Sequence, residues 1–201
     1  MEEKRPKVLA LYQAVLQLLD AGADINALKV SDITDCAGIG KGTAYEYFKS
    51  KEEIIASALT YDLDKKIRAE LVYLENCPRF AERIRRIFDW ITTQHAEQKS
   101  FTRYLRLTTQ ICEVNAALLA AIKEKQQELG GGPVMLIEKI CRQGKESGEI
   151  RSDIPAKAAT IQVLADLTAF VMYLERRQET CELEPEWMKD FLCGGLIKSL
   201  A

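Results

Sequence analysis

The fold is decided by residues 33–53, which read ITDCAGIGKGTAYEYFKSKEE. This stretch predicts a short helix, a tight turn over residues 38–40 and a second short helix over residues 41–48. Ala44 and Phe48 are one helical turn apart, so both side chains should face inward from the second helix. Two short helices joined by a glycine-containing turn form a helix-turn-helix, whose second helix can enter the major groove of DNA.

Helices are expected on both sides of this motif. Ser50 is followed three residues later by Glu53, which is the capping-box pattern, so a long helix should start there. Upstream, apolar residues recur with helical spacing over residues 6–21, which predicts an amphipathic helix that covers the motif. The sequence therefore predicts a DNA-binding domain over residues 1–50 and a second domain over residues 51–201.

Residues 37–53 resemble the most recognisable segment of the TetR/AcrR family of bacterial transcriptional regulators, and the specific match covers roughly residues 8–55. The resemblance implies that the motif binds double-stranded DNA, and it assigns roles to residues by their position in the motif. Base-edge contacts in the major groove are implied for Lys41, Gly42, Thr43 and Tyr45, and phosphate contacts for Tyr47 and Lys51.

Three other residues of this region stand out. Lys29 is found where the family usually has a capping Thr or Ser, and because a lysine there can reach a phosphate we count it among the DNA-binding candidates. Gly40 replaces a Ser that commonly caps the second motif helix, although glycine is a tolerable N-cap. Glu46 either accepts a hydrogen bond from a cytosine amine or faces solvent, and facing solvent is the simpler expectation.

The remaining sequence predicts an all-α fold, because helical spacing continues and strand-like alternation is not seen. The long helix should end near residue 76, ahead of Pro78. Further helices are expected over about residues 80–95, 101–112, 115–129, 134–147, 156–177 and 185–200. The family usually has one helix over residues 115–147, but three glycines followed by Pro133 should break it here. Gly148 should cap the helix that follows the break.

Composition is that of a soluble protein with a substantial core: 201 residues, 47% hydrophobic and 29% charged. No run approaches the ~18 uninterrupted apolar residues of a membrane span. The N-terminal residues lack the apolar segment of a signal peptide, so we expect a cytoplasmic protein without a membrane partner. The net charge is −2, and the first 55 residues hold seven Lys or Arg against nine Asp or Glu. Charge therefore does not decide whether the chain binds nucleic acid; the motif does.

The family resemblance also implies a small-molecule inducer and a homodimer. In this family the inducer binds inside the helical bundle after residue 51, and the last two helices, here residues 156–177 and 185–200, form the dimer interface. Candidate ligand-binding residues combine an apolar body with a polar tip, although each is more often a plain core or surface residue. They are Tyr61, Trp90, His95, Tyr104, Thr108, Cys112 and Asp166.

Other classes of protein are poorly supported. The six cysteines include no C-x-x-C pair and the chain has a single histidine, which argues against a zinc site, so we expect neither a metal nor a cofactor. No nucleophile–base pair or phosphate-binding loop indicates an enzyme. The leading hypothesis is a ligand-responsive homodimeric repressor that binds a near-palindromic operator. A helical protein-interaction module without DNA binding and an all-α enzyme remain as alternatives, and thiol sensing by one or two cysteines is a further one.

Overall fold

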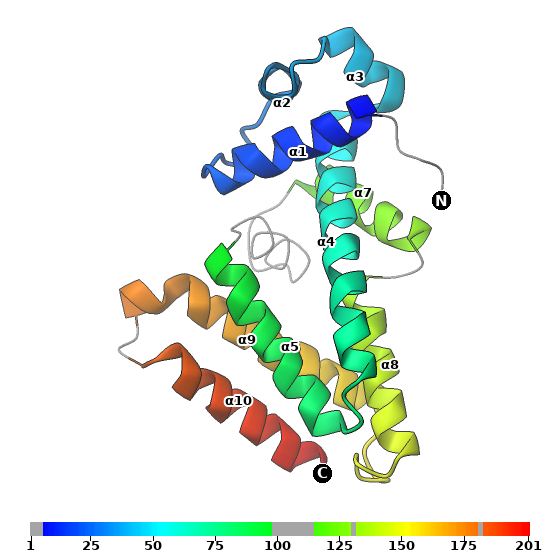
Figure 1. Cartoon of the computed structure of the whole chain (residues 1–201), viewed down its shortest axis with the longest axis vertical. Helices are drawn as coiled ribbons and strands as arrows, with labels where there is room; N and C mark the ends of the chain where they lie inside the picture. Colours follow the sequence, from blue (N-terminus) through cyan, green and yellow to red (C-terminus); the bar gives the residue numbers. More distant parts are fainter. Residues whose placement is uncertain (1–5, 98–114, 130–131, 181–182) are drawn as a thin grey trace. The chain divides into compact units, whose positions relative to one another are not determined.

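The computed structural model of the chain describes residues 6–97, 115–129, 132–180 and 183–201, and within these residues it contains helices and no strands (Figure 1). The all-α prediction is therefore confirmed. The helix predicted over residues 101–112 lies outside the described residues. The helices are α1 (Pro6–Asp20), α2 (Val30–Ala37), α3 (Lys41–Tyr47), α4 (Lys51–Glu75), α5 (Phe80–Glu97), α7 (Ala116–Glu128), α8 (Pro133–Glu146), α9 (Ala156–Thr180) and α10 (Pro185–Leu200).

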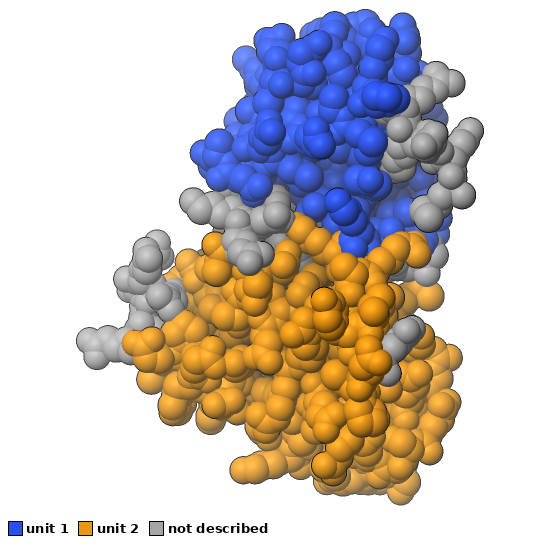
Figure 2. Space-filling model, viewed as in Figure 1, with its two compact units in different colours: residues 1–65, 98–130 blue, residues 66–97, 131–201 orange. Residues whose placement is uncertain are grey.

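The chain divides into two compact units, and the division falls inside α4 (Figure 2). The first unit comprises residues 1–65 and 98–130, and the second comprises residues 66–97 and 131–201. Helices α1 to α3, the first part of α4 and α7 therefore belong to the first unit. The functional boundary expected at residue 50 stays a prediction, because compactness and function need not divide a chain at the same residue.

The core of the helix-turn-helix is made where α1 packs against both α2 and α3. Leu11 and Val15 of α1, Ile33 of α2 and Ala44 of α3 are all fully buried. Phe48, which directly follows α3, is also buried, and its ring lies 6.0 Å from that of Tyr12, measured between centroids. The inward positions expected for Ala44 and Phe48 are confirmed, and they fix which side of α3 faces away from the protein.

The turn between α2 and α3 depends on a left-handed glycine. Gly38 has φ 64° and ψ 31°, and its N–H donates to the carbonyl of Asp35. The N–H of Ile39 then donates to the carbonyl of Thr34 at 2.9 Å, which satisfies a second free carbonyl at the end of α2. At the other end of α2, the backbone N–H of Lys29 donates to the carboxylate of Asp32 at 2.9 Å. Asp32 thus supplies the half of a capping box that satisfies the Lys29 N–H, whereas Lys29 provides no side-chain acceptor for the N–H groups of the first turn.

Gly38→Ala and Gly42→Ala should change the free energy of unfolding in opposite directions. A Cβ at either glycine would meet no atom within 4 Å, so the two sites offer equal space. Only Gly38 has a positive φ, which should cost alanine about 1–2 kcal/mol. Gly42 lies inside α3, where alanine should add up to about 1 kcal/mol. Urea unfolding followed by circular dichroism measures both changes, and a stabilised Gly38→Ala variant would contradict this account of the turn.

The start of α4 is buried all the way round. Every residue from Ile54 to Thr60 is buried, whereas a helix with one covered face would expose about half of them. Helix α1 accounts for one side, and α7, whose Leu118 and Ile122 are buried, lies beside the same part of α4 (Figure 1). The first unit therefore holds α4 between the helix-turn-helix and α7.

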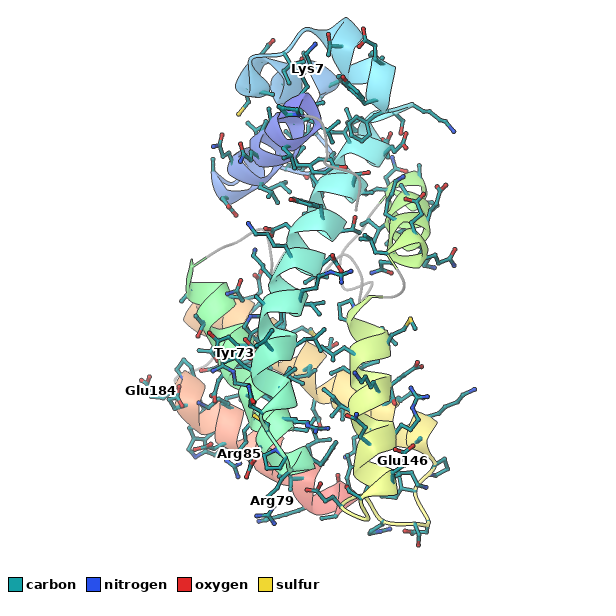
Figure 3. The ribbon with its side chains drawn as sticks, turned by 45° about the vertical axis from the view of Figure 1, so that its right-hand side comes forward. Lys7, Tyr73, Arg79, Arg85, Glu146 and Glu184 are labelled. Atoms are coloured by element: carbon teal, nitrogen blue, oxygen red, sulfur yellow. The ribbon has the colours of Figure 1, made fainter. Side chains whose placement is uncertain are left out.

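In the second unit, α9 packs against α5, α8 and α10. Phe88 of α5 and Phe170 of α9 are fully buried, with ring centroids 5.2 Å apart. The last part of α4 is held to α5 by Arg86, which binds the buried carboxylate of Glu70 through two N–H groups. The Arg86 guanidinium also lies 5.0 Å from the ring centroid of Tyr73, a residue of α4 that is labelled in Figure 3. These contacts anchor the end of α4 in the second unit.

The predicted break between residues 129 and 133 is confirmed, because α7 and α8 are separate helices. Helix α8 begins at Pro133 instead of Val134, since proline lacks only an N–H that the first turn does not use. Its end is closed by Gly148 at φ 75°, as expected from the sequence. Gly144, inside α8, allows close packing, because a Cβ there would lie 3.0 Å from both Ile150 and Phe80.

Helix α9 is unusually apolar for its length, which bears on the expectation of no membrane partner. Among the described residues, Ala156–Arg176 is a stretch long and apolar enough to cross a membrane, judged by length and composition alone. A core helix of a soluble protein passes the same test. Since α9 packs against three other helices of its unit, its apolar character is accounted for without a membrane.

Candidate nucleic-acid interface and effector region

The outward side of α3 carries the residues expected to read DNA bases. Lys41 and Gly42 are exposed, Thr43 is half-buried, and Tyr45 is 50% exposed. All four belong to one helix of seven residues, whose inner side is fixed by the buried Ala44. The structure therefore brings the base-contacting candidates together on the helix that follows the turn, which is the helix that enters the groove in a helix-turn-helix.

The candidates for phosphate contact lie around this helix. Lys29 is exposed at the start of α2, and Tyr47 is half-buried at the end of α3. Lys51, at the start of α4, donates through Nζ to the backbone oxygen of Asn26 at 3.1 Å. An ammonium group has three donors, so this bond leaves others for a phosphate while holding the lysine in place. The phosphate-contacting roles of these residues stay predictions.

The connection from α3 to α4 is fixed by Glu53, which has two roles. Its backbone N–H donates to the Ser50 hydroxyl at 3.1 Å, and its carboxylate accepts from the backbone N–H of Lys49 at 2.7 Å. The Ser50 bond is the half of the capping box expected from the sequence, whereas the return bond to Glu53 comes from Lys49, one residue before the expected donor Ser50. The other carboxylate oxygen lies 3.5 Å from Nζ of Lys125 on α7. The segment that follows the recognition helix is thereby tied to α7 as well as to α4.

Further polar contacts join α7 to this region, and the sequence analysis did not find them. The side-chain amide of Asn115 donates to Glu52 at 3.5 Å. A separate contact joins α1 to α4. Burial raises the pKa of the Tyr12 phenol on α1, and a side-chain hydrogen bond with Ser57 on α4 opposes that effect. Lys125 carries no sequence signal that identifies its partner, because Lys125 and Glu53 are brought together only by the tertiary fold.

The candidate ligand-binding residues are divided between the two units. Tyr61 lies in the first unit, where its ring centroid is 5.4 Å from that of Tyr12. Trp90 and His95 lie on α5 in the second unit, and Nε2 of His95 is 3.9 Å from a carboxylate oxygen of Glu175. Tyr104, Thr108 and Cys112 lie outside the described residues. Among the described candidates, Tyr61 thus belongs to one unit and Trp90 and His95 to the other, and their ligand-binding roles stay predictions.

Two polar groups in the second unit have the character of ligand contacts. Burial raises the pKa of Asp166, on α9, above its ordinary value. On α5, the side-chain oxygen of Gln94 is buried and has no hydrogen-bond partner among the described residues. Gln94 was not singled out from the sequence, since a glutamine next to the more conspicuous His95 carries no pattern of its own. An unpaired buried oxygen is costly, and a ligand N–H or O–H can satisfy it.

Helices α9 and α10 expose apolar residues where the family resemblance implies a dimer interface. Ile161 and Met172 of α9 and Phe191 of α10 are exposed, and the rings of Trp187 and Phe191 stack with their centroids 5.2 Å apart. One turn further along α10, Gly195 is exposed and a Cβ there would meet no atom within 4 Å. Apolar rings and a glycine on an exposed helix face are typical of a surface that a partner covers.

Comparison with known proteins identifies the class of protein to which these features belong. Residues 21–58 match the family model described as bacterial regulatory proteins, tetR family. The helix-turn-helix of this chain is thus of the TetR-family type, as the sequence resemblance implied. The predicted class of the chain, a ligand-responsive transcriptional regulator with a helix-turn-helix and a helical C-terminal region, is confirmed.

Two curated relatives of the chain are regulators. The chain is 25% identical over 159 residues to the fatty acid metabolism regulator protein of Bacillus subtilis (strain 168), a match that covers 79% of this chain and 78% of that protein. It is also 37% identical over 59 residues to the HTH-type transcriptional regulator SAR0097 of Staphylococcus aureus (strain MRSA252), covering 29% of each protein.

Solved structures share the fold over nearly the whole chain. The fatty acid degradation regulator FadR from Bacillus halodurans has a TM-score of 0.75 at 19% identity, covering 98% of this chain and 97% of that chain. FadR from Bacillus subtilis, solved in complex with stearoyl-CoA, has a TM-score of 0.75 at 17% identity, covering 96% and 99% of the two chains. The fold shared with these two regulators therefore extends beyond the helix-turn-helix over nearly the whole chain.

Proposed function

We propose that the protein is a homodimeric transcriptional repressor that binds a near-palindromic operator and is released from it by a small-molecule inducer. The observation that carries the proposal is the outward side of α3, where Lys41, Gly42 and Tyr45 are exposed around a buried Ala44. Base contacts from this helix would supply sequence preference, and phosphate contacts from lysines such as Lys51 would position the protein. A DNA partner implies that the protein acts in the cytoplasm.

The dimer is proposed to form through α9 and α10, over residues 156–177 and 185–200. The exposed residues Ile161, Trp187 and Phe191 support this, because apolar side chains on one helical surface are stabilised when a second copy covers them. Gly195 lies on the same exposed side of α10 and would let two helices approach closely. A two-fold dimer presents two α3 helices, which address half-sites about one DNA turn, ~34–36 Å, apart.

The inducer is proposed to be a long-chain fatty acyl-CoA. Support comes from the match to the fatty acid metabolism regulator of Bacillus subtilis and from the fold shared with a FadR that was solved with stearoyl-CoA. Helix α4 offers a path for the response, since residues 51–65 belong to the first unit and residues 66–75 to the second. A ligand weakens DNA binding only if it prefers the conformation with lower DNA affinity.

Stearoyl-CoA should weaken operator binding, whereas free CoA and stearate should not. Typical coupling free energies of about 1–3 kcal/mol correspond to about 5–150-fold weaker binding at saturation. Fluorescence anisotropy of an operator selected from random duplexes measures this, with each compound below its critical micelle concentration. Equal operator affinity with and without stearoyl-CoA would exclude an acyl-CoA inducer. Operator binding in its absence would still stand as a separate result.

A further inference from the structure

Two residues of α3, one of them an acid, lie on the side of the helix opposite its buried face. A helix turns by about 100° per residue, so the residues two before and two after Ala44 lie roughly 160–200° around the helix from it. These residues are Gly42 and Glu46. Ala44 is fully buried, and both Gly42 and Glu46 are exposed. Because Gly42 has no side chain, Glu46 is the side chain that points most directly away from the protein.

The carboxylate of Glu46 is not neutralised within the protein. Among the described residues, it has no ion pair or hydrogen-bonding partner. Lys41 and Lys49 are exposed at the two ends of α3 and form no ion pair with it. Two neighbouring acids are used within the protein, since Asp32 caps α2 and Glu53 caps α4. Glu46 is thus an uncompensated negative charge in the middle of the surface that would face DNA.

We propose that Glu46 determines operator preference by accepting a hydrogen bond from the N4 amine of a cytosine in each half-site. The inference rests on the proposed DNA-binding function and adds the identity of one base pair. An acid that faces a polyanion is repelled by the phosphates, so it weakens binding to DNA in general. A cytosine amine in the major groove offsets that repulsion, because it donates to a carboxylate that lacks any other partner.

This arrangement gives specificity in two ways. When the DNA has a cytosine at the position facing Glu46, the hydrogen bond stabilises the protein–DNA complex. Sequences that present an acceptor there, such as the O4 of thymine, bring two acceptors together and are disfavoured. Gly42, one helical turn before Glu46, leaves room for the edge of the groove to approach the helix. A single exposed acid therefore rejects incorrect sites as well as selecting the correct one.

The test is a comparison of the sequences bound by the intact wild-type chain and by Glu46→Ala, each selected from the same random duplex library. The wild type should select a cytosine at one position of each half-site, and Glu46→Ala should lose that preference by about 10-fold or more while keeping the others. Replacing that cytosine by 2-pyrimidinone, which lacks the amine, should weaken binding of the wild type by a similar factor and leave Glu46→Ala unchanged.

Asp35→Asn is the matched control, because Asp35 is an exposed acid of α2 in the same unit and its loss changes the charge equally. It should leave the base preferences unaltered. If Glu46→Ala keeps the wild-type preference at every position, or if the Glu46-dependent preference falls on another base, the inference is overturned. If the wild type selects no sequence at all, the proposed DNA-binding function fails, and that outcome is distinguishable from the first two.

Discussion

Phe191→Asp should convert the dimer into a monomer and weaken operator binding at least about 100-fold. Phe191 is 61% exposed within one chain, so the substitution should leave the fold of the subunit intact. At the proposed interface, however, it would bury a charge against the partner. A monomer presents one α3 to DNA and loses the gain in effective concentration that links the two half-sites. Analytical ultracentrifugation and anisotropy on the selected operator measure the two effects.

Val72→Asp is the matched control for this experiment. Val72 is also 61% exposed, on α4, and lies outside the proposed interface. It should leave both the dimer and operator binding unchanged. If Phe191→Asp remains dimeric, or if Val72→Asp dissociates the dimer equally, the dimer does not form through α10 as proposed.

Tyr45→Ala should remove most of the discrimination between operator and scrambled DNA. A good base contact is worth about 1–3 kcal/mol, and a dimer places two copies of Tyr45 on each operator. The two losses add in free energy, which gives a decrease of roughly 100-fold in operator affinity, with little change on scrambled duplex. Tyr45→Phe separates the ring from the hydroxyl. Anisotropy titrations on both duplexes at one salt concentration measure the change.

Tyr73→Ala controls for the loss of an exposed tyrosine, since Tyr73 is 59% exposed on α4 (Figure 3). Tyr73→Ala should change the affinity for neither the operator nor the scrambled duplex.

Lys51→Ala should weaken binding to both duplexes about equally and flatten the salt dependence, as expected for a phosphate contact. If Tyr45→Ala weakened binding equally on operator and scrambled DNA, Tyr45 would be a positioning contact and not a reader of bases.

The helix-turn-helix was predictable because its signals are local. Gly38 closes α2 in a left-handed conformation, Ser50 and Glu53 cap α4, and the spacing of Ala44 and Phe48 fixes the inner side of α3. Each signal depends on residues within a few positions of one another, so the sequence specifies it without knowledge of the rest of the chain. The break before α8 was predictable for the same reason, from glycines followed by a proline.

The contacts that depend on tertiary structure were not predictable. Ile54, Ile55 and Leu59 recur with helical spacing at the start of α4, but Ala56, Ser57 and Thr60 are buried as well, on other sides of the helix. They are buried because the first unit surrounds this part of α4, and no pattern within α4 reports that. The pairing of Lys125 with Glu53 is likewise a meeting of residues distant in the chain.

The most direct test of the central claim is the affinity of the intact chain for its selected operator, compared with a scrambled duplex at the same salt concentration. If α3 reads base edges as a pair of helices in a dimer, the operator should bind at least about 10³-fold more tightly than the scrambled duplex. Equal affinity for the two duplexes would contradict the account, because binding would then depend on phosphates alone.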